Sequence, residues 1–130
     1  MLLDTSGLMC LHDQADANYA EAQRLYGEVA QKLTHNYVLA EFVALTHARR
    51  LARQPALALL AALAQEPQIE IVWVDEQLHG QAMRLLQRQL DKAYSLCDAV
   101  SSILMRQRNL TDALTTDHHF IQAGVHQLLK

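Results

Sequence analysis

The sequence is poor in residues that break or cross-link chains. Its 130 residues include 4 glycines, 2 prolines and 2 cysteines, and only 5% are aromatic. The scarcity of glycine and proline, together with a hydrophobic content of 51%, excludes a disordered, collagenous or low-complexity protein. Two cysteines, Cys10 and Cys97, are too few for a disulfide scaffold, so we expect buried thiols in a reducing compartment.

The sequence also lacks a long apolar run and an excess of positive charge. The most apolar stretch, residues 56–64, is far shorter than the roughly 20 residues of a membrane helix. The first residues show neither the basic nor the apolar segment of a secretory signal. Eleven lysines and arginines stand against 14 acidic residues, which excludes a globally basic nucleic-acid binder. We therefore expect one soluble cytoplasmic domain over residues 1–130, with no membrane association.

Strand-like and helix-like segments alternate along the chain. The clearest strand covers residues 69–75, and its continuous apolar character predicts a central parallel strand. Further strands are expected at residues 2–3, ending in a turn at 4–7, and at residues 33–38, 113–116 and 125–129. Helices are expected over residues 16–32 with Asp16 as N-cap, 39–53 ending at Gln54-Pro55, 56–65, 78–90, 98–108 and 117–123.

Helices between strands imply crossover connections, which join parallel strands. The predicted fold class is therefore α/β, a three-layer arrangement with a central parallel sheet of about four to five strands flanked by helices. Binding and catalytic sites in such sheets form at the carboxyl ends of the strands, near the point where the strand order reverses.

Three aspartates are predicted to share that edge. Asp4 and Asp117 each close a strand, and Asp98 begins a helix. Each also has a structural interpretation, because Asp4 and Asp117 could cap following helices and Ser95 stands at capping-box spacing from Asp98. Converging carboxylates repel by about 4 kcal/mol per pair at about 4 Å, so such a cluster requires cations. Oxygen ligands without a thiolate pair favour Mg²⁺ or Mn²⁺ over Zn²⁺.

A fourth carboxylate, Glu41, is predicted to emerge from an apolar helix face. The residues three, four and seven positions ahead of it are Ala44, Leu45 and Ala48. Burying an unpaired carboxylate costs roughly several kcal/mol, so we expect Glu41 to be neutral, paired with a cation such as a nearby arginine, or bound to a metal.

These residues lie in four short motifs. The motifs are Leu3-Asp4-Thr5-Ser6, Ala40-Glu41-Phe42, Ser95-Leu96-Cys97-Asp98-Ala99, and Ala113-Leu114-Thr115-Thr116-Asp117-His118-His119-Phe120 followed by Gln122-Ala123-Gly124. In this order and at these separations they resemble a PIN-domain ribonuclease of the VapC-like toxin branch of toxin–antitoxin systems, over essentially the whole chain. One departure from the family pattern is the short segment before Asp4, which suggests an abbreviated first strand or a start codon assigned late.

The resemblance implies a metal-dependent endoribonuclease that hydrolyses RNA phosphodiester bonds. Its catalytic acidic quartet would be Asp4, Glu41, Asp98 and Asp117, of which Asp4, Asp98 and Asp117 would be the ligands of one or two Mg²⁺ or Mn²⁺ ions and Glu41 would act through water. Ser6 and Thr115 match small hydroxyl positions that orient carboxylates. The resemblance also implies a homodimer and a cognate antitoxin protein whose peptide covers the acidic pocket.

RNA binding requires positively charged side chains that contact phosphates. Arg49 and Arg53, and again Arg84 and Arg88, stand four residues apart on predicted helices, which suits either phosphate contacts or a solvated helix face. Arg106 and Arg108 are weaker candidates, because helix C-termini favour cations anyway. The Ala/Leu-rich segment 56–64 is either a well-buried helix or a surface for a partner or a second copy.

Other functional classes have less support. The histidines include no His-x₃-His pair, which argues against zinc, and Ser101 and Ser102 lack a glycine-flanked nucleophile turn. A haloacid-dehalogenase-like phosphatase would need a second aspartate two residues after Asp4, where the chain has Ser6. The main alternative is a catalytically silent PIN-like domain that binds RNA or protein; it would have lost carboxylates, and all four are present.

Overall fold

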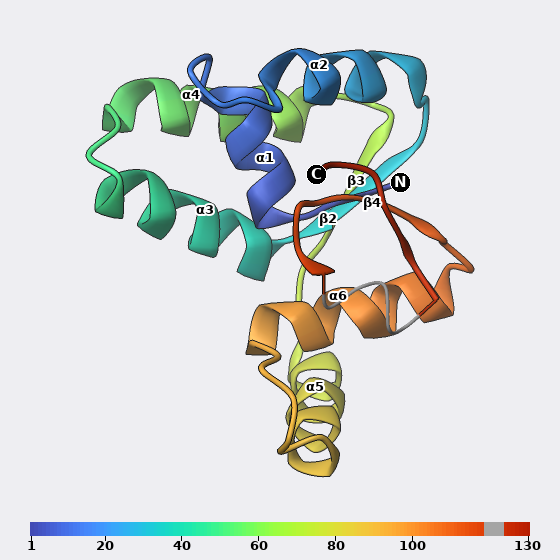
Figure 1. The fold of residues 1–130 in the computed structure, drawn as a ribbon. Helices are drawn as coiled ribbons and strands as arrows, with labels where there is room; N and C mark the ends of the chain where they lie inside the picture. The colour runs from blue at the N-terminus through green and yellow to red at the C-terminus, as the bar shows by residue number, and fades with distance from the viewer. Residues whose placement is uncertain (119–123) are drawn as a thin grey trace.

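The computed structural model describes residues 1–118 and 124–130 and confirms the predicted α/β fold, with five strands and six helices among these residues (Figure 1). The elements in chain order are β1 Leu2–Leu3, α1 Thr5–His12, α2 Tyr19–Glu28, β2 Lys32–His35, α3 Asn36–Ala48, α4 Arg53–Gln65, β3 Ile69–Val72, α5 Glu76–Arg88, α6 Leu96–Gln107, β4 Asp112–Leu114 and β5 His126–Gln127. No helix in the described ranges is both long and apolar enough to cross a bilayer.

The strands form a single sheet in the order β3-β2-β1-β4-β5, and every described pair is parallel. From β1 the chain first builds outward through β2 to β3, and then returns to add β4 and β5 on the other side. The strand order therefore reverses between β1 and β4, where a functional site is expected.

Helices cover both faces of the sheet (Figure 1). Leu2 and Leu3 of β1 are both fully buried, and successive strand residues point to opposite faces. Leu3 joins a core cluster with side chains of α1, α2, α3 and α4, whereas Leu2 joins a second cluster with α5 and α6. The two-residue strand β1 is thus the centre of a three-layer structure.

Strand β3 lies at the edge of the sheet, so the prediction that it is central was wrong. It pairs with β2 alone among the described strands. Its apolar run has another cause: Ile69 packs against one core cluster and Val72 and Val74 against the other. A continuous apolar strand therefore reports that helices cover both faces, which also holds at this edge.

Several predicted boundaries also shift. The turn expected at residues 4–7 is instead the start of α1, and the helix expected over 39–53 ends at Ala48. Pro55 lies in the first turn of α4, where its missing N–H has no helical partner to lose. Asp16 does not cap α2; its Oδ1 accepts from the N–H of Asn18, which holds the N-cap position. Of the helix expected at 117–123, residues 119–123 fall outside the described ranges.

Helix α4 is mostly exposed. It buries only Ala56 and Leu63, and Leu57 is 46% exposed. The interpretation of segment 56–64 as a well-buried helix was therefore wrong, and its role as a partner surface remains a prediction.

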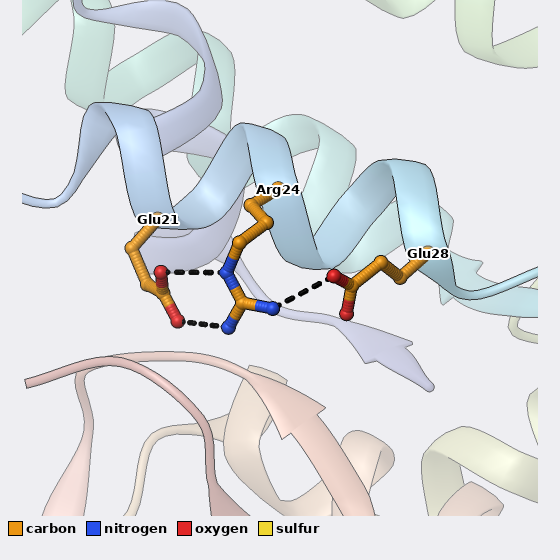
Figure 2. Close-up of polar contacts among 3 residues, drawn as sticks. All are labelled: Glu21, Arg24 and Glu28. Atoms are coloured by element: carbon orange, nitrogen blue, oxygen red, sulfur yellow. Dashed lines mark hydrogen bonds and ion pairs between the residues drawn. The ribbon is translucent and has the colours of Figure 1, made fainter.

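Helix α2 packs on the core through one fully buried residue, Ala22, and through the partly buried Leu25 and Tyr26, and it carries ion pairs within its own exposed face. Arg24 pairs with Glu21 one turn before it and with Glu28 one turn after it, the latter at 2.8 Å (Figure 2). All three side chains are about half exposed, and pairs of this kind add little to stability because water and salt screen them.

Candidate active site

Asp4 lies at the carboxyl end of β1, beside β4, where the strand order reverses. Its side chain is only 4% exposed and occupies the N-cap position of α1 without capping that helix. Instead, Oδ2 of Asp4 accepts hydrogen bonds from Thr115 Oγ1 at 2.8 Å and from Ser6 Oγ at 3.4 Å. The carboxylate is therefore oriented partly by the loop that follows β4.

Ser6 and Thr115 tie helix α1 to that loop. Their hydroxyl oxygens lie 3.0 Å apart. Thr115 Oγ1 accepts from the backbone N–H of Asp117 at 2.9 Å, and Ser6 Oγ accepts from the backbone N–H of Thr116 at 3.0 Å. Because Thr115 donates its own proton to Asp4, Ser6 is the donor in the contact between the two hydroxyls, and its single proton is shared between Thr115 Oγ1 and Asp4 Oδ2. The backbone of residues 115–117 and the Asp4 carboxylate are thus fixed relative to each other.

The carboxyl group of Asp4 resists ionisation. Its pKa is raised from 3.8 to about 6, chiefly because burial disfavours the charged form. The negative charges of Asp98 and Asp117 act in the same direction, and the hydrogen bond from Thr115 opposes them. A carboxyl group perturbed by both burial and neighbouring charges is typical of a functional site.

Asp98 combines a structural contact with a place in the acidic cluster. Ser95 Oγ accepts from the N–H of Asp98 at 3.0 Å, and Asp98 Oδ2 accepts from the N–H of Ser95 at 2.9 Å, which completes a capping box at the start of α6. The capping interpretation is therefore correct. Burial also raises the pKa of Asp98, and the charges of Asp117 and Glu41 add to this effect. Asp98 thus caps α6 within electrostatic range of three other carboxylates, those of Asp4, Glu41 and Asp117.

Glu41 is exposed, so the prediction that it emerges from a buried stripe was wrong. Helix α3 buries a different face, formed by Val38, Phe42 and Thr46. Because water solvates the Glu41 carboxylate, the cost of burying a charge gives no reason to expect a metal ion beside it. Its negative charge raises the pKa of Asp98, so its position beside the start of α6 is what supports a functional role.

The acidic residues do not form a closed metal cage. Among residues 1–118 and 124–130, no three histidine, cysteine, aspartate or glutamate side chains converge closely enough to enclose an ion. The charges of Asp4, Asp98 and Asp117 nevertheless act on one another. Mg²⁺ gives up its waters reluctantly and binds through one or two carboxylates while keeping several waters. The donor set therefore fits hydrated Mg²⁺ or Mn²⁺ rather than an enclosed tetrahedral zinc ion.

The two cysteines are core residues, as predicted. Both are buried and unpaired. Burial raises the pKa of the Cys10 thiol to about 11 and raises that of Cys97 as well. Since the thiolate is the reactive form, neither cysteine suits nucleophilic chemistry near neutral pH.

Ser101 contacts a histidine, the arrangement that a serine hydrolase would need. Ser101 Oγ lies 2.8 Å from Nε2 of His35, and both residues are fully buried. His35 Nδ1 accepts from the N–H of Val38, so Nε2 carries the proton and donates it to the serine. A histidine that donates to Ser101 cannot act as its base, and burial lowers the pKa of His35 to about 4. The contact is structural.

We expect Ser101→Ala to lower the free energy of unfolding by about 1–3 kcal/mol, because it leaves the Nε2–H of His35 buried without an acceptor. Urea denaturation measures the difference. Ser102→Ala, at the half-buried neighbouring position, is the matched control and should change stability little. A Ser101→Ala protein as stable as the Ser102→Ala protein would contradict this assignment.

The arginines predicted to contact RNA lie in two places. Arg49 follows the last residue of α3 and Arg53 begins α4, and both are exposed. Arg84 and Arg88 are exposed on α5 and line a groove against α6. For both pairs, RNA contact remains a prediction. Arg108 is already engaged, because its guanidinium binds both carboxylate oxygens of Glu70.

Gly7 is a residue of this site that the sequence patterns did not indicate. A Cβ at Gly7 would lie 1.9 Å from the carbonyl oxygen of Leu114, so this glycine allows α1 to approach β4 beside Asp4. Its only sequence signal is a small residue directly after Asp4-Thr5-Ser6 in a chain with few glycines. Arg106 lines the same groove as Arg84 and Arg88, which no local pattern could indicate.

Comparisons with known proteins agree over nearly the whole chain. The family model described as "PIN domain" matches residues 1–125. Two relatives, both named 23S rRNA-specific endonuclease VapC20 and from the CDC 1551 / Oshkosh and ATCC 25618 / H37Rv strains of Mycobacterium tuberculosis, are each 31% identical over 125 residues, covering 95% of this chain and 94% of theirs. The crystal structure of M. tuberculosis VapC20, a sarcin-ricin loop cleaving toxin, has a TM-score of 0.88 and 29% identity, covering 99% of this chain and 98% of that one. On this evidence, the chain belongs to the PIN domain family.

Proposed function

We propose that this chain is a Mg²⁺- or Mn²⁺-dependent endoribonuclease and the toxin of a toxin–antitoxin pair. Asp4 carries the proposal, because a buried carboxyl group whose pKa is raised by burial and by two neighbouring aspartates lies where the strand order reverses. Whole-chain similarity to an endonuclease named for 23S rRNA supports the same reaction class, hydrolysis of RNA phosphodiester bonds.

In the proposed mechanism, Asp4, Asp98 and Asp117 would hold one or two ions through carboxylate oxygens. A bound ion would supply Lewis acidity, which lowers the pKa of a water molecule and offsets charge on the phosphate. Glu41, exposed beside the start of α6, would orient the attacking water. Ser6 and Thr115 hold Asp4 Oδ2, so the Asp4 carboxylate cannot rotate away from its working position.

We also propose partners and a cellular location for this chain. Residues 1–130 would act as a single PIN-like nuclease domain in the cytoplasm. The chain would form a homodimer and would be held inactive by a cognate antitoxin, for which an arginine reaching the acidic cluster is physically suitable. Since the relatives are named for 23S rRNA, ribosomal RNA is the first substrate to test.

A second candidate is a catalytically silent PIN-like domain that binds RNA or protein. One observation favours it, namely that no three potential metal ligands converge within the described part of the chain. This candidate predicts binding without cleavage in the presence of Mn²⁺.

The test separates the two roles of Asp98. Asp98→Asn keeps an oxygen that can accept from the N–H of Ser95 but removes the negative charge, so we expect metal affinity and RNA cleavage to fall by at least about 100-fold. Ser95→Ala removes the hydroxyl half of the capping box and keeps the carboxylate. It should lower stability by about 1 kcal/mol and leave metal affinity near that of the wild type.

Isothermal titration of Mn²⁺ into EDTA-treated protein measures metal affinity, and subsequent incubation with a structured rRNA fragment measures RNA cleavage. Metal binding and cleavage that both fail in Asp98→Asn and persist in Ser95→Ala would establish the carboxylate nuclease. Metal binding without cleavage in the wild type would favour the silent domain. No metal binding in the wild type would return Asp98 to a purely structural role.

A further inference from the structure

A groove runs between α5 and α6, at some distance from the acidic cluster along the chain. We call it the arginine groove. Its polar lining consists of Arg84, Arg88 and Gln81 from α5 and Arg106 and Gln107 from α6, and no described acidic residue lines it. Its volume of about 280 Å³ lies just below the range of pockets that enclose small ligands. The groove therefore suits a chain segment that lies across it.

No described acidic side chain pairs with the three arginines of the groove. Within the part of the chain that the structure describes, Arg84, Arg88 and Arg106 form no ion pair, whereas Arg24 and Arg108 are each bound by glutamates. Like charges gathered in one groove attract polyanions and raise their local concentration. This concentration of positive charge is a local property, because the chain as a whole is acidic.

An exposed tryptophan extends the arginine groove. Trp73 follows β3, is 71% exposed and lines an adjoining hollow that shares Gln81 and Gln107 with the groove. Proteins that bind single-stranded nucleic acid combine a cationic groove for the backbone with an aromatic side chain on which a base stacks. Trp73 and the arginine groove provide both components side by side.

The groove is also within reach of the acidic cluster. Asp98 and Arg106 lie eight residues apart on α6, which places them about 12 Å apart along the helix axis. That span corresponds to about four stacked nucleotides of one strand at 3.4 Å each. An RNA strand whose cleavage point lies at the acidic cluster can therefore continue into the arginine groove.

We propose that the arginine groove and Trp73 bind a single-stranded segment of RNA that flanks the cleavage point, with phosphates on the arginines and a base stacked on Trp73. The inference rests on the proposed function for its choice of RNA as the ligand. A second copy of the chain is the less suitable occupant, because a two-fold contact through this groove would bring its unpaired arginines toward each other.

Fluorescence anisotropy with a fluorescein-labelled uridine 12-mer in EDTA measures binding without cleavage. The groove variant, Arg84→Gln/Arg88→Gln/Arg106→Gln, should raise Kd at least tenfold, and its slope of log affinity against log salt should become shallower by about 2. The control variant, Arg24→Gln/Arg50→Gln/Lys130→Gln, removes the same total charge elsewhere and should change Kd less than about threefold.

Trp73 provides an independent readout, because it is the only tryptophan in the chain. Stacking should quench its emission as the 12-mer is added, with the same Kd as the anisotropy measurement. Trp73→Leu should weaken binding at least about fivefold. Emission that does not change while the RNA binds would overturn the stacking part of the proposal.

Three results would overturn the proposal that RNA binds in the arginine groove. Equal weakening by the groove and control variants would indicate a general charge effect, and an unchanged Kd in the groove variant would place the RNA elsewhere. A groove variant with altered oligomeric mass by light scattering but unchanged RNA affinity would make the groove an interface between copies. Mn²⁺-dependent cleavage distinguishes the two proposals. If the groove variant cleaves and binds RNA as well as the wild-type protein does, the groove proposal is rejected and the nuclease proposal stands. If the wild-type protein binds RNA in the groove but does not cleave it, the nuclease proposal is rejected and the groove proposal stands.

Discussion

Asp4→Asn is expected to abolish metal-dependent RNA cleavage and, in the absence of metal, to stabilise the fold at pH 7. Asparagine retains an oxygen that can accept from Thr115 but carries no charge for a cation. Losing a ligand that contributes several kcal/mol of charge stabilisation should slow cleavage at least about 10³-fold. Single-turnover cleavage with Mn²⁺ measures the loss.

The stability effect follows from the pKa of Asp4. Because the folded-state pKa is raised from 3.8 to about 6, the folded protein binds this proton more tightly than the unfolded chain. The free energy of unfolding should therefore fall as pH rises from about 4 to about 6, and the loss is complete above that window. The penalty on the ionised form is about 3 kcal/mol, which Asp4→Asn should largely remove.

Urea denaturation between pH 4 and 7, in EDTA, measures how steeply the free energy of unfolding changes with pH in the wild type and in Asp4→Asn. Asp91→Asn removes the same charge at an exposed position and should keep both the pH slope and the cleavage rate of the wild type. If Asp4→Asn cleaves RNA at the wild-type rate, the active-site assignment is wrong. If it keeps the wild-type pH slope, another group is responsible for that slope.

Gly7→Ala should be the most destabilising of the four possible glycine-to-alanine substitutions in the chain. The new Cβ would lie 1.9 Å from the carbonyl oxygen and 2.7 Å from the carbonyl carbon of Leu114, and backbone atoms cannot rotate away as a side chain can. Helix propensity favours alanine by about 1 kcal/mol, but overpacking of this severity costs about 3 kcal/mol or more and outweighs it. We also expect weaker cleavage, because moving α1 off β4 separates Ser6 from Thr115.

Gly27→Ala is the matched control, since Gly27 is also helical and a Cβ there meets nothing within 4 Å. It should leave stability unchanged or raise it by up to about 1 kcal/mol. Thermal and urea unfolding of the two variants give the comparison. A Gly7→Ala protein as stable as Gly27→Ala would mean that α1 does not approach β4 as closely as the structure describes.

The sequence by itself determined the features that depend on near neighbours. Alternating helical and extended segments identify a parallel α/β fold, and the three-residue spacing of Ser95 and Asp98 identifies a capping box. The apolar settings of Cys10 and Cys97 predict their burial. Each of these features follows from a periodicity or spacing within a few residues, so the sequence carries the whole cause.

Only the tertiary structure decided which distant segments meet. It placed β3 at the edge, exposed Glu41, and joined Thr115 to Asp4 across 111 residues of sequence. It also brought Arg106 to Arg84 and Arg88, and it required Gly7 to lack a side chain. A strand's apolar pattern reports that its two faces are covered but not which strand lies beside it. Which strands become neighbours depends on how the whole chain packs, so it cannot be determined from the local pattern of one strand.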